Sequence, residues 1–136
     1  MTQAHLQTPP TAGTTVTHRR YVDHSRAHYG GGLVDGGYVM GLFSDVATDL
    51  SLHTDGDEGL LASYSRVDFH APLRAGDVLE ITATLTRVGT RSRTVSFVAN
   101  VLVRAGGDGS SSRGEVLVEP LPIASATGTV VVPPQG

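Results

Sequence analysis

The chain has 136 residues, of which 39% are apolar, and ten basic against thirteen acidic side chains give a net charge of -3. That apolar fraction can fill the core of one domain but not of two. All ten basic residues are arginine and they form no basic stripe, so we expect no nucleic-acid partner and no anionic membrane partner. The lack of cysteine excludes disulfides and cysteine-ligated metals, and the lack of lysine excludes a Schiff base.

Flexible segments flank one predicted domain, which covers residues 14–132. Residues 1–13 have neither the cationic start nor the apolar stretch of a signal peptide, so they indicate a flexible arm and a soluble, cytoplasmic protein. Residues 133–136 are predicted to be a flexible end, and the Gly/Ser-rich run at 105–114 is typical of an exposed loop. No apolar run approaches the roughly 20 residues that a membrane-spanning helix needs.

A helical period follows the first predicted strand, which covers residues 14–22. At about 100° per residue, the segment 33–50 places one set of apolar side chains within a single broad arc. This arc holds Leu33, Met40, Phe43, Ala47 and Leu50. A second arc is an acidic stripe that holds Asp35, Tyr38, Leu42, Asp45 and Asp49. The segment therefore predicts a long helix that buries one side and presents carboxylates on another.

After the helix the hydrophobic period changes to two, which predicts a run of antiparallel strands. The predicted strands cover residues 61–69, 78–88, 95–103 and 116–132. The first of them is expected to place on one face Leu61, Ser63, Ser65, Val67 and Phe69. Pro72 ends that strand because proline lacks the amide that a ladder needs. Gly89-Thr90 predicts a turn between the second and third of these strands. Pro120 and Pro122 interrupt the last extended region.

One long helix and about five strands predict an α+β domain. A helix with so wide an apolar arc has to be covered, and the sheet is the surface that can cover it. An antiparallel sheet wrapped round one long central helix is the hotdog fold, which we therefore predict. One small sheet cannot enclose the helix fully, so we also expect a homodimer, or a higher assembly of dimers, whose sheets join edge to edge.

Several short motifs carry a family resemblance. They are His28-Tyr29-Gly30-Gly31, Leu33-Val34-Asp35-Gly36, Leu42-Phe43, Asp45-Val46-Ala47-Thr48, Asp55-Gly56-Asp57-Glu58-Gly59, Ala71-Pro72 and Ala75-Gly76-Asp77. Together they resemble the 3-aminobutyryl-CoA ammonia-lyase family of lysine degradation, within the hotdog acyl-CoA enzymes, over residues 22–132. Ser44 stands where the family is expected to have Gly, and Gly37 where Ala is commoner, which leaves the acyl chain of the substrate open.

A glycine triplet before the predicted helix is the first candidate binding element. The element and its neighbours are His28, Tyr29, Gly30, Gly31, Gly32 and Leu33. Glycine lets the backbone approach a ligand, and free amides of the first helical turn, from Gly31 to Leu33, would hold a thioester oxygen. A loop that needs positive φ angles is an equally good interpretation of the triplet alone, but the adjoining His28 and Tyr29 favour the functional one.

Carboxylates supply the candidate acid–base groups. On an ordinary surface helix the acidic stripe is a solvated face, whereas a carboxylate enclosed by sheet and partner must be paired or have a raised pKa, which suits a general base. The acidic turn at 55–59 is typical of a solvated turn, but its Glu58 is expected to point back to the helix start. We assign the two catalytic carboxylate roles to Asp35 and Glu58, without deciding which is the base, and supporting roles to Asp45, His28 and Tyr29.

Arginines surround the predicted turn at Gly89-Thr90, and they form the second candidate binding element. The element consists of Arg87, Arg91, Ser92 and Arg93. Such a group can bind phosphates through charge-assisted hydrogen bonds, although arginine on a hairpin is more often a solvated edge. The resemblance to hotdog enzymes favours the phosphates of coenzyme A, and Tyr64 is a further substrate-binding candidate.

Two other kinds of site are not supported. The six histidines show no i, i+4 pair on a helix and no clustered ligand spacing apart from His24 and His28 in a loop, so we expect no metal. The serines lie in no G-x-S-x-G elbow. The resemblance implies reversible elimination of ammonia from a 3-aminoacyl-CoA, without an organic cofactor. The alternatives are a hotdog acyl-CoA thioesterase, which needs the same oxygen site, and a non-enzymatic acyl-CoA-binding module.

Overall fold

The computed structural model describes residues 9–106 and 111–134, in which eight strands, two short 3-10 helices and one α-helix follow one another along the chain. In chain order these are β1 (Thr15–Tyr21), η1 (His24–Arg26), β2 (Ala27–Tyr29), η2 (Gly30–Gly32), β3 (Leu33–Val34), α1 (Gly36–Asp55), β4 (Leu60–Phe69), β5 (Leu73–Arg74), β6 (Val78–Val88), β7 (Ser92–Ala105) and β8 (Gly114–Val131). The arm predicted at 1–13, the loop at 105–114 and the end at 133–136 lie partly outside the described residues.

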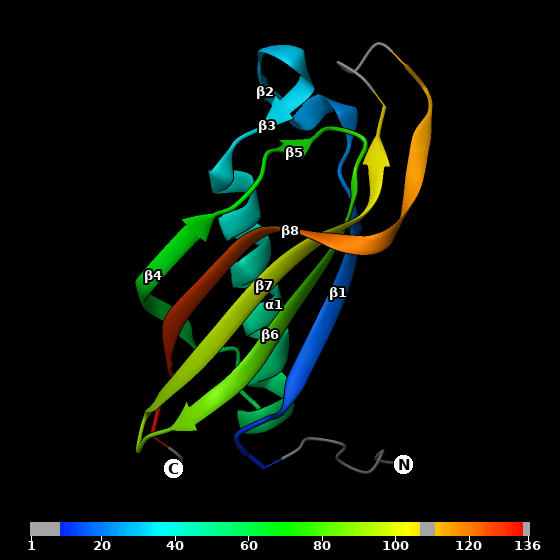
Figure 1. Ribbon diagram of the computed structural model, residues 1–136. Coiled ribbons are helices and arrows are strands. Elements are labelled where there is room, and N and C mark those ends of the chain that lie inside the picture. Colours follow the sequence, from blue (N-terminus) through cyan, green and yellow to red (C-terminus); the bar gives the residue numbers. More distant parts are fainter. Residues whose placement is uncertain (1–8, 107–110, 135–136) are drawn as a thin grey trace, which may run out of the picture.

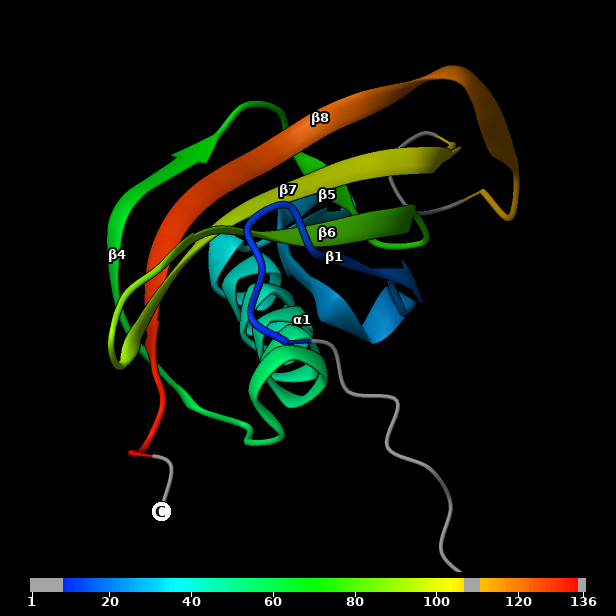
Figure 2. The ribbon, with the colours of Figure 1, turned by 90° about the horizontal axis from the view of Figure 1, so that it is seen from below.

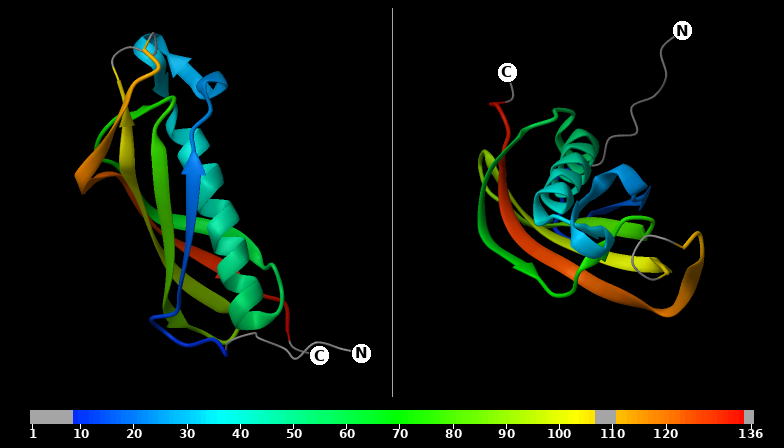
Figure 3. Two further views of the ribbon diagram at one scale, coloured as in Figure 1. Left: turned by 90° about the vertical axis from the view of Figure 1, so that its right-hand side faces the viewer. Right: turned by 90° about the horizontal axis from the view of Figure 1, so that it is seen from above.

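A five-stranded antiparallel sheet curves round α1 (Figure 2). Its strand order is β1-β6-β7-β8-β4, so β1 and β4 form its two edges. Viewed down the helix, the strands enclose α1 on one side and leave the other side open (Figure 3). The predicted hotdog arrangement is therefore confirmed. None of the helices in the described residues combines the length and the hydropathy that a membrane crossing needs.

A second, three-stranded sheet lies at the N-terminal end of α1 and was not predicted (Figure 1). Its order is β2-β3-β5, with Leu33 opposite Arg74 and Val34 opposite Leu73. These long-range pairs take Leu33 and Val34 out of the helix, which begins at Gly36 rather than at residue 33. The helix also continues past residue 50 to Asp55, where Gly56 ends it with a left-handed φ of 67°.

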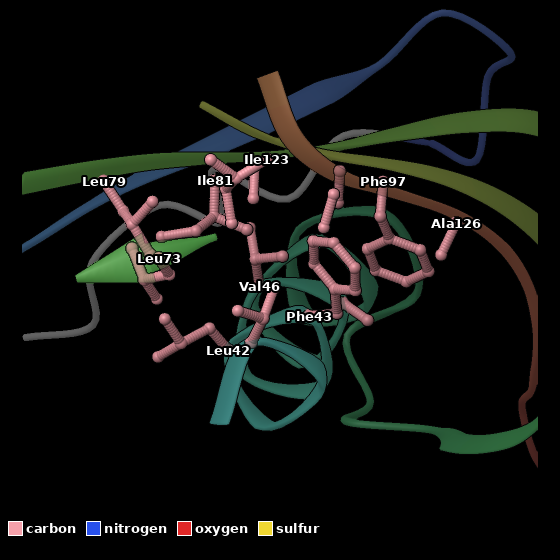
Figure 4. Close-up of a cluster of buried hydrophobic side chains, with 14 of the residues drawn as sticks. Leu42, Phe43, Val46, Leu73, Leu79, Ile81, Phe97, Ile123 and Ala126 are labelled. Atoms are coloured by element: carbon pink, nitrogen blue, oxygen red, sulfur yellow. The ribbon is translucent and has the colours of Figure 1, made fainter. Parts of the chain in front are cut away.

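The core lies between α1 and the concave face of the large sheet (Figure 4). Phe43 of α1 stacks on Phe97 of β7 with 5.0 Å between ring centroids. Alternate residues of β6 and β7 point to the helix, as predicted, and the buried ones are Leu79, Ile81, Ala83, Leu85, Val95, Phe97, Ala99 and Val101. On the helix itself, Leu42 is buried, so it belongs to the apolar side and not to the acidic stripe.

Two irregularities in β4 make its predicted faces wrong. The register to β8 shifts between Leu61 and Ser63 and again between Tyr64 and Arg66. Each extra residue reverses the alternation, so the side chains that pack on the core are Leu61, Tyr64 and Val67, three residues apart. Strict alternation over residues 61–69 would have placed Tyr64 on the opposite face.

A buried carboxylate ties the β5–β6 turn to the end of β7. Asp77 is 0% exposed and accepts hydrogen bonds from the amides of Arg74 (2.9 Å) and Ala105 (2.7 Å). It also receives the Arg104 guanidinium at 2.8 Å, and Arg104 in turn donates to the carbonyl of Pro72 at 2.7 Å. This network fixes the segment that connects β4 to β6.

Replacing Asp77 tests this network. Asp77→Ala leaves the Arg104 charge and two amides without their acceptor, and removing one partner of a buried pair costs about 3–5 kcal/mol. We expect that loss in the free energy of unfolding measured by urea denaturation. The exposed Glu119 provides the control, because Glu119→Ala should change it by less than about 0.5 kcal/mol. Equal stability of the two variants would contradict the structural role of Asp77.

Candidate active site

A cavity of about 510 Å³ opens at the N-terminal end of α1, between that helix end, the small sheet and the β4–β5 connection. Its wall is mostly apolar and is lined by Leu33, Val34, Gly36, Val39, Phe69, Ala71, Pro72, Leu73 and Ile123. Tyr29 and Asp35 add polar side chains, and His70 completes the lining. An apolar cavity with few polar groups is the usual form of a small-molecule site.

Asp35 stands at the helix start, in the N-cap position with extended backbone. Asp35 was predicted to lie inside the helix, but the helix begins about one turn later than predicted, so Asp35 precedes it. Its side chain makes no capping hydrogen bond, although capping is what aspartate usually does at this position. The first helical amides, those of Gly36 and Gly37, have no carbonyl one turn before them in the helix, and the helix dipole adds positive potential there. The cavity thus contains an uncapped carboxylate at a helix start, and Gly36, the first residue of the helix, belongs to its lining.

The glycine triplet does not begin the helix. Gly30, Gly31 and Gly32 form a 3-10 turn, and β3 separates them from α1. Gly31 and Gly32 have φ angles of 76° and 77°, so the turn itself requires glycine. The predicted helix-start amides at 31–33 are corrected to those at Gly36 and Gly37. Of the triplet's neighbours, Leu33 and Tyr29 line the cavity.

The remaining candidates near this end lie outside the cavity wall. His28 is exposed and packs edge-on against Tyr29, with 4.7 Å between ring centroids. Asp45 is exposed on the outer side of α1, as expected of a solvated stripe. Asp49, from the same stripe, lies 2.6 Å from His18 Nε2 and 3.1 Å from His53 Nε2. These positions leave Asp35 as the carboxylate in the cavity.

Glu58 lies at the opposite end of the helix. It follows Gly56, the C-terminal cap of α1, and a helix of 20 residues is about 30 Å long. Within one chain Glu58 therefore cannot reach the cavity that contains Asp35, and the expectation that it points back to the helix start is wrong. It lines a second groove, of about 340 Å³, together with Asp57 and Arg91.

The arginine element divides into a buried and an exposed part. Arg93 is 7% exposed and forms a two-point ion pair with Asp55, at 2.7 Å and 3.2 Å, while also donating to the carbonyl of Gly89. This guanidinium is committed to the end of α1, which corrects its predicted phosphate-binding role. Arg87, Arg91 and Ser92 are exposed, and Arg91 donates to the carbonyl of Val132 at 3.3 Å.

Tyr64 also has a different place from the one expected. Its ring packs edge-on against Phe97, 6.1 Å away, and burial raises the pKa of its phenol above the ordinary value. Its oxygen is buried without a hydrogen-bond partner in the described part of the chain. Tyr64 does not line the cavity at Asp35. Within residues 9–106 and 111–134, no three His, Asp or Glu side chains gather in a way that could hold a metal ion.

Phe69 is one of several cavity residues that were not predicted from the sequence. Its ring covers the helix start so closely that a Cβ atom on Gly36 would lie 2.6 Å from Phe69 Cζ. His70, next in the chain, bonds Ser125 Oγ through Nε2 at 2.8 Å. The neighbours of Ser125 on β8, Ala124 and Ala126, face the core, so the imidazole is turned to the other face of the sheet. The sequence signal that could have identified Phe69 is its position as a large apolar residue just before Pro72, where the strand was predicted to end.

The different roles of Arg93 and Arg91 give a direct test. Arg93→Ala leaves the Asp55 carboxylate buried without its partner, so we expect about 3–5 kcal/mol less stability in urea unfolding. Arg91→Ala removes an exposed side chain and should change stability by less than about 1 kcal/mol. Comparable losses in the two variants would contradict the division into a buried and an exposed part.

Comparison with known proteins first defines the class. The family model of the Thioesterase superfamily matches residues 31–110, and the chain belongs to this superfamily. A variant of the acyl-CoA hydrolase of Staphylococcus aureus in complex with coenzyme A shares the fold, with a TM-score of 0.71 and 21% identity over 87% of this chain and 64% of that one.

Two ammonia lyases are more similar. The chain is 46% identical over 107 residues to 3-aminobutyryl-CoA ammonia lyase of Acetoanaerobium sticklandii, covering 79% of this chain and 85% of that protein, and it belongs to this family. The structure of β-alanyl-CoA:ammonia lyase from Clostridium propionicum has a TM-score of 0.84 and 28% identity, over 93% of this chain and 94% of that one. The resemblance and the enzyme class, a carbon–nitrogen lyase, are confirmed.

Proposed function

We propose that the chain eliminates ammonia from 3-aminobutyryl-CoA, or from a closely related 3-aminoacyl-CoA, to give the 2-enoyl-CoA, and that it also catalyses the reverse addition. The observation that carries this proposal is the carboxylate of Asp35, which lies free of a capping bond in an apolar cavity at a helix start. The names of the two ammonia lyases support the same reaction. A place in lysine degradation and in the cytoplasm belongs to the proposal.

The chemistry follows from the positions of these groups. The Asp35 carboxylate takes the proton from the α-carbon, and the electron pair of that bond moves onto the thioester oxygen. The amides of Gly36 and Gly37 donate hydrogen bonds to this oxygen, and one such donor is typically worth on the order of 3 kcal/mol in the transition state. The enolate then re-forms its carbonyl, the double bond forms, and the β-carbon–nitrogen bond breaks with its electron pair on nitrogen, which releases ammonia. The proposed steps use neither an organic cofactor nor a metal.

The second carboxylate enters the proposal through a homodimer. Strand β4 is an edge strand, and its two ends carry exposed apolar side chains, Leu60 at 75% and Phe69 at 54%. An antiparallel pairing of β4 with a second copy about the midpoint of the strand places Leu60 of the partner subunit opposite Phe69. Glu58 of the partner subunit then lies beside the wall of the Asp35 cavity. There it would hold the substrate ammonium.

The exposed arginines complete the proposed substrate site. Arg91 shares a groove with Glu58, so the same pairing brings Arg91 of the partner subunit to the mouth of the Asp35 cavity. With Arg87 and Ser92 it would bind the phosphates of coenzyme A, whose remainder runs along the subunit boundary. This pairing uses one sheet edge of each subunit, β4, and leaves the other edge, β1, unpaired. Dimers of this kind are therefore compatible with larger assemblies of several dimers.

The role of the base is tested by Asp35→Asn, which keeps the size of the side chain but removes its basicity. We expect turnover of 3-aminobutyryl-CoA to fall by about a hundredfold or more while the thermal unfolding midpoint stays near that of the native protein. Enoyl absorbance and free thiol should be followed together. Near-native turnover in the variant would contradict the assignment, and enzymatic thiol release from butyryl-CoA would favour a thioesterase.

The shared site is tested by mixing two inactive variants, Asp35→Asn and Glu58→Gln. In a mixed dimer one site carries both changes and the other carries neither, so random exchange of equal amounts should restore about a quarter of native activity. Light scattering should show a dimer, and exchange should be verified with a tag on one variant. Verified exchange without recovery of activity would contradict the contribution of Glu58 from the partner subunit.

A further inference from the structure

Phe69, the last residue of β4, brings a large side chain to the start of α1. It lies two residues after Val67, so it shares the face of the strand that packs on the core. A Cβ atom built on Gly36 would lie 2.6, 2.8 and 3.1 Å from Cζ, Cε1 and Cε2 of Phe69. The tip of the ring therefore lies against the first residue of the helix, the one that directly follows Asp35.

Phe69 differs in burial from the core side chains that form much of the cavity wall. These side chains are at most 7% exposed, and they are Val34, Val39, Leu73 and Ile123. Phe69 lines the same cavity but is 54% exposed. Its ring can therefore change in size or position without disturbing the packing between α1 and the large sheet, whereas a change in the other four would disturb the core.

Glycine at position 36 permits this place of the ring. The φ angle of Gly36 is not positive, so the backbone itself does not require glycine there. An ordinary contact begins at 3.4 Å, so a methyl group at position 36 would move the ring tip, now 2.6 Å from that position, by about 0.8 Å. Gly36 also belongs to one of the motifs that carry the family resemblance, Leu33-Val34-Asp35-Gly36.

We infer that Phe69 is a specificity-determining residue, whose ring limits the length of the acyl chain that the site accepts. The inference rests on the proposed function, in which Asp35 takes the α-proton at the helix start. Because the ring lies against the residue after Asp35 and lines the same cavity, a substrate held there has the carbons beyond its α-carbon beside the ring. A four-carbon acyl chain ends beside Phe69, and each further methylene group has to displace the ring.

The experiment measures ammonia elimination from 3-aminobutyryl-CoA and from 3-aminohexanoyl-CoA, which is two methylene groups longer. The readout is the kcat/KM of the longer substrate divided by that of the shorter one. We expect Phe69→Ala to raise this ratio about tenfold or more, and Phe69→Leu to raise it less, since one methylene group in an apolar pocket is worth about 10–200-fold in discrimination. Leu52→Ala is the control, because Leu52 is similarly exposed, at 48%, and does not line the cavity.

A second substitution tests whether the ring acts from its place against the helix start. Gly36→Ala displaces the ring, so it should change the ratio in the native background and leave it unchanged in the Phe69→Ala background. A loss of turnover common to both substrates cancels in the ratio. Gly41→Ala is the matched control on the same helix, because a Cβ atom there would meet no atom within 4 Å.

The outcomes separate this inference from the proposed function. Thermal unfolding and light scattering verify the fold and the assembly of each variant, and Phe69→Leu decides the question if Phe69→Ala does not fold. A native ratio in the folded Phe69 variants, or a Gly36→Ala effect that persists without the ring, would overturn the role of Phe69 alone. Native protein that eliminates no ammonia from either thioester would overturn the proposed function and this inference with it.

Discussion

The contact between α1 and the concave face of the large sheet determines where every other feature of the molecule can lie. Phe43 stacked on Phe97, with Leu42, Val46 and the inward residues of β6 around it, fixes the helix along the sheet. Burial of these side chains supplies most of the stabilisation, at about 25 cal/mol per Å² of apolar surface. The side of α1 that faces the sheet is buried, and the two cavities of the site lie at the two ends of the helix.

The two ends are held by different interactions and serve different purposes. At the C-terminal end, the ion pair of Arg93 with Asp55 anchors the helix to the β6–β7 hairpin. At the N-terminal end, the small sheet and the Asp77–Arg104 network hold the wall of a cavity around an uncapped Asp35. A side chain that forgoes its stabilising cap at such a place fits a catalytic role better than a structural one. The length of the helix is also the reason why the proposal assigns the second carboxylate, Glu58, to another subunit.

The sequence predicted those parts of the fold that depend on neighbouring residues in the chain. Alternation in β6 and β7 and the existence of the long helix follow from local hydrophobic periods. The start of the helix could not be predicted, because Leu33 and Val34 pair with β5, about 40 residues further along the chain, and that pairing leaves no local signal. The irregularities of β4 likewise depend on its register with β8.

The sequence likewise predicted only those site residues that lie close together in the chain. Asp35, Tyr29 and Leu33 were found because they are close in sequence to a helix start, whereas Phe69 comes from a distant strand. Arg93 shares its parity with Val95 and Phe97, so the alternation already indicated an inward side chain, but its partner Asp55 could not be seen from the pattern. Glu58 was placed wrongly because its distance from Asp35 depends on the full length of the helix.

The central claim, that Asp35 moves the α-proton, is tested most directly by hydrogen exchange at the α-carbon. Native protein incubated with 3-aminobutyryl-CoA in deuterated water should introduce deuterium at that carbon, detected by mass spectrometry of the recovered thioester. Asp35→Asn should lose this exchange while still binding the thioester. Undiminished exchange in the variant would show that another group removes the proton and would contradict the account.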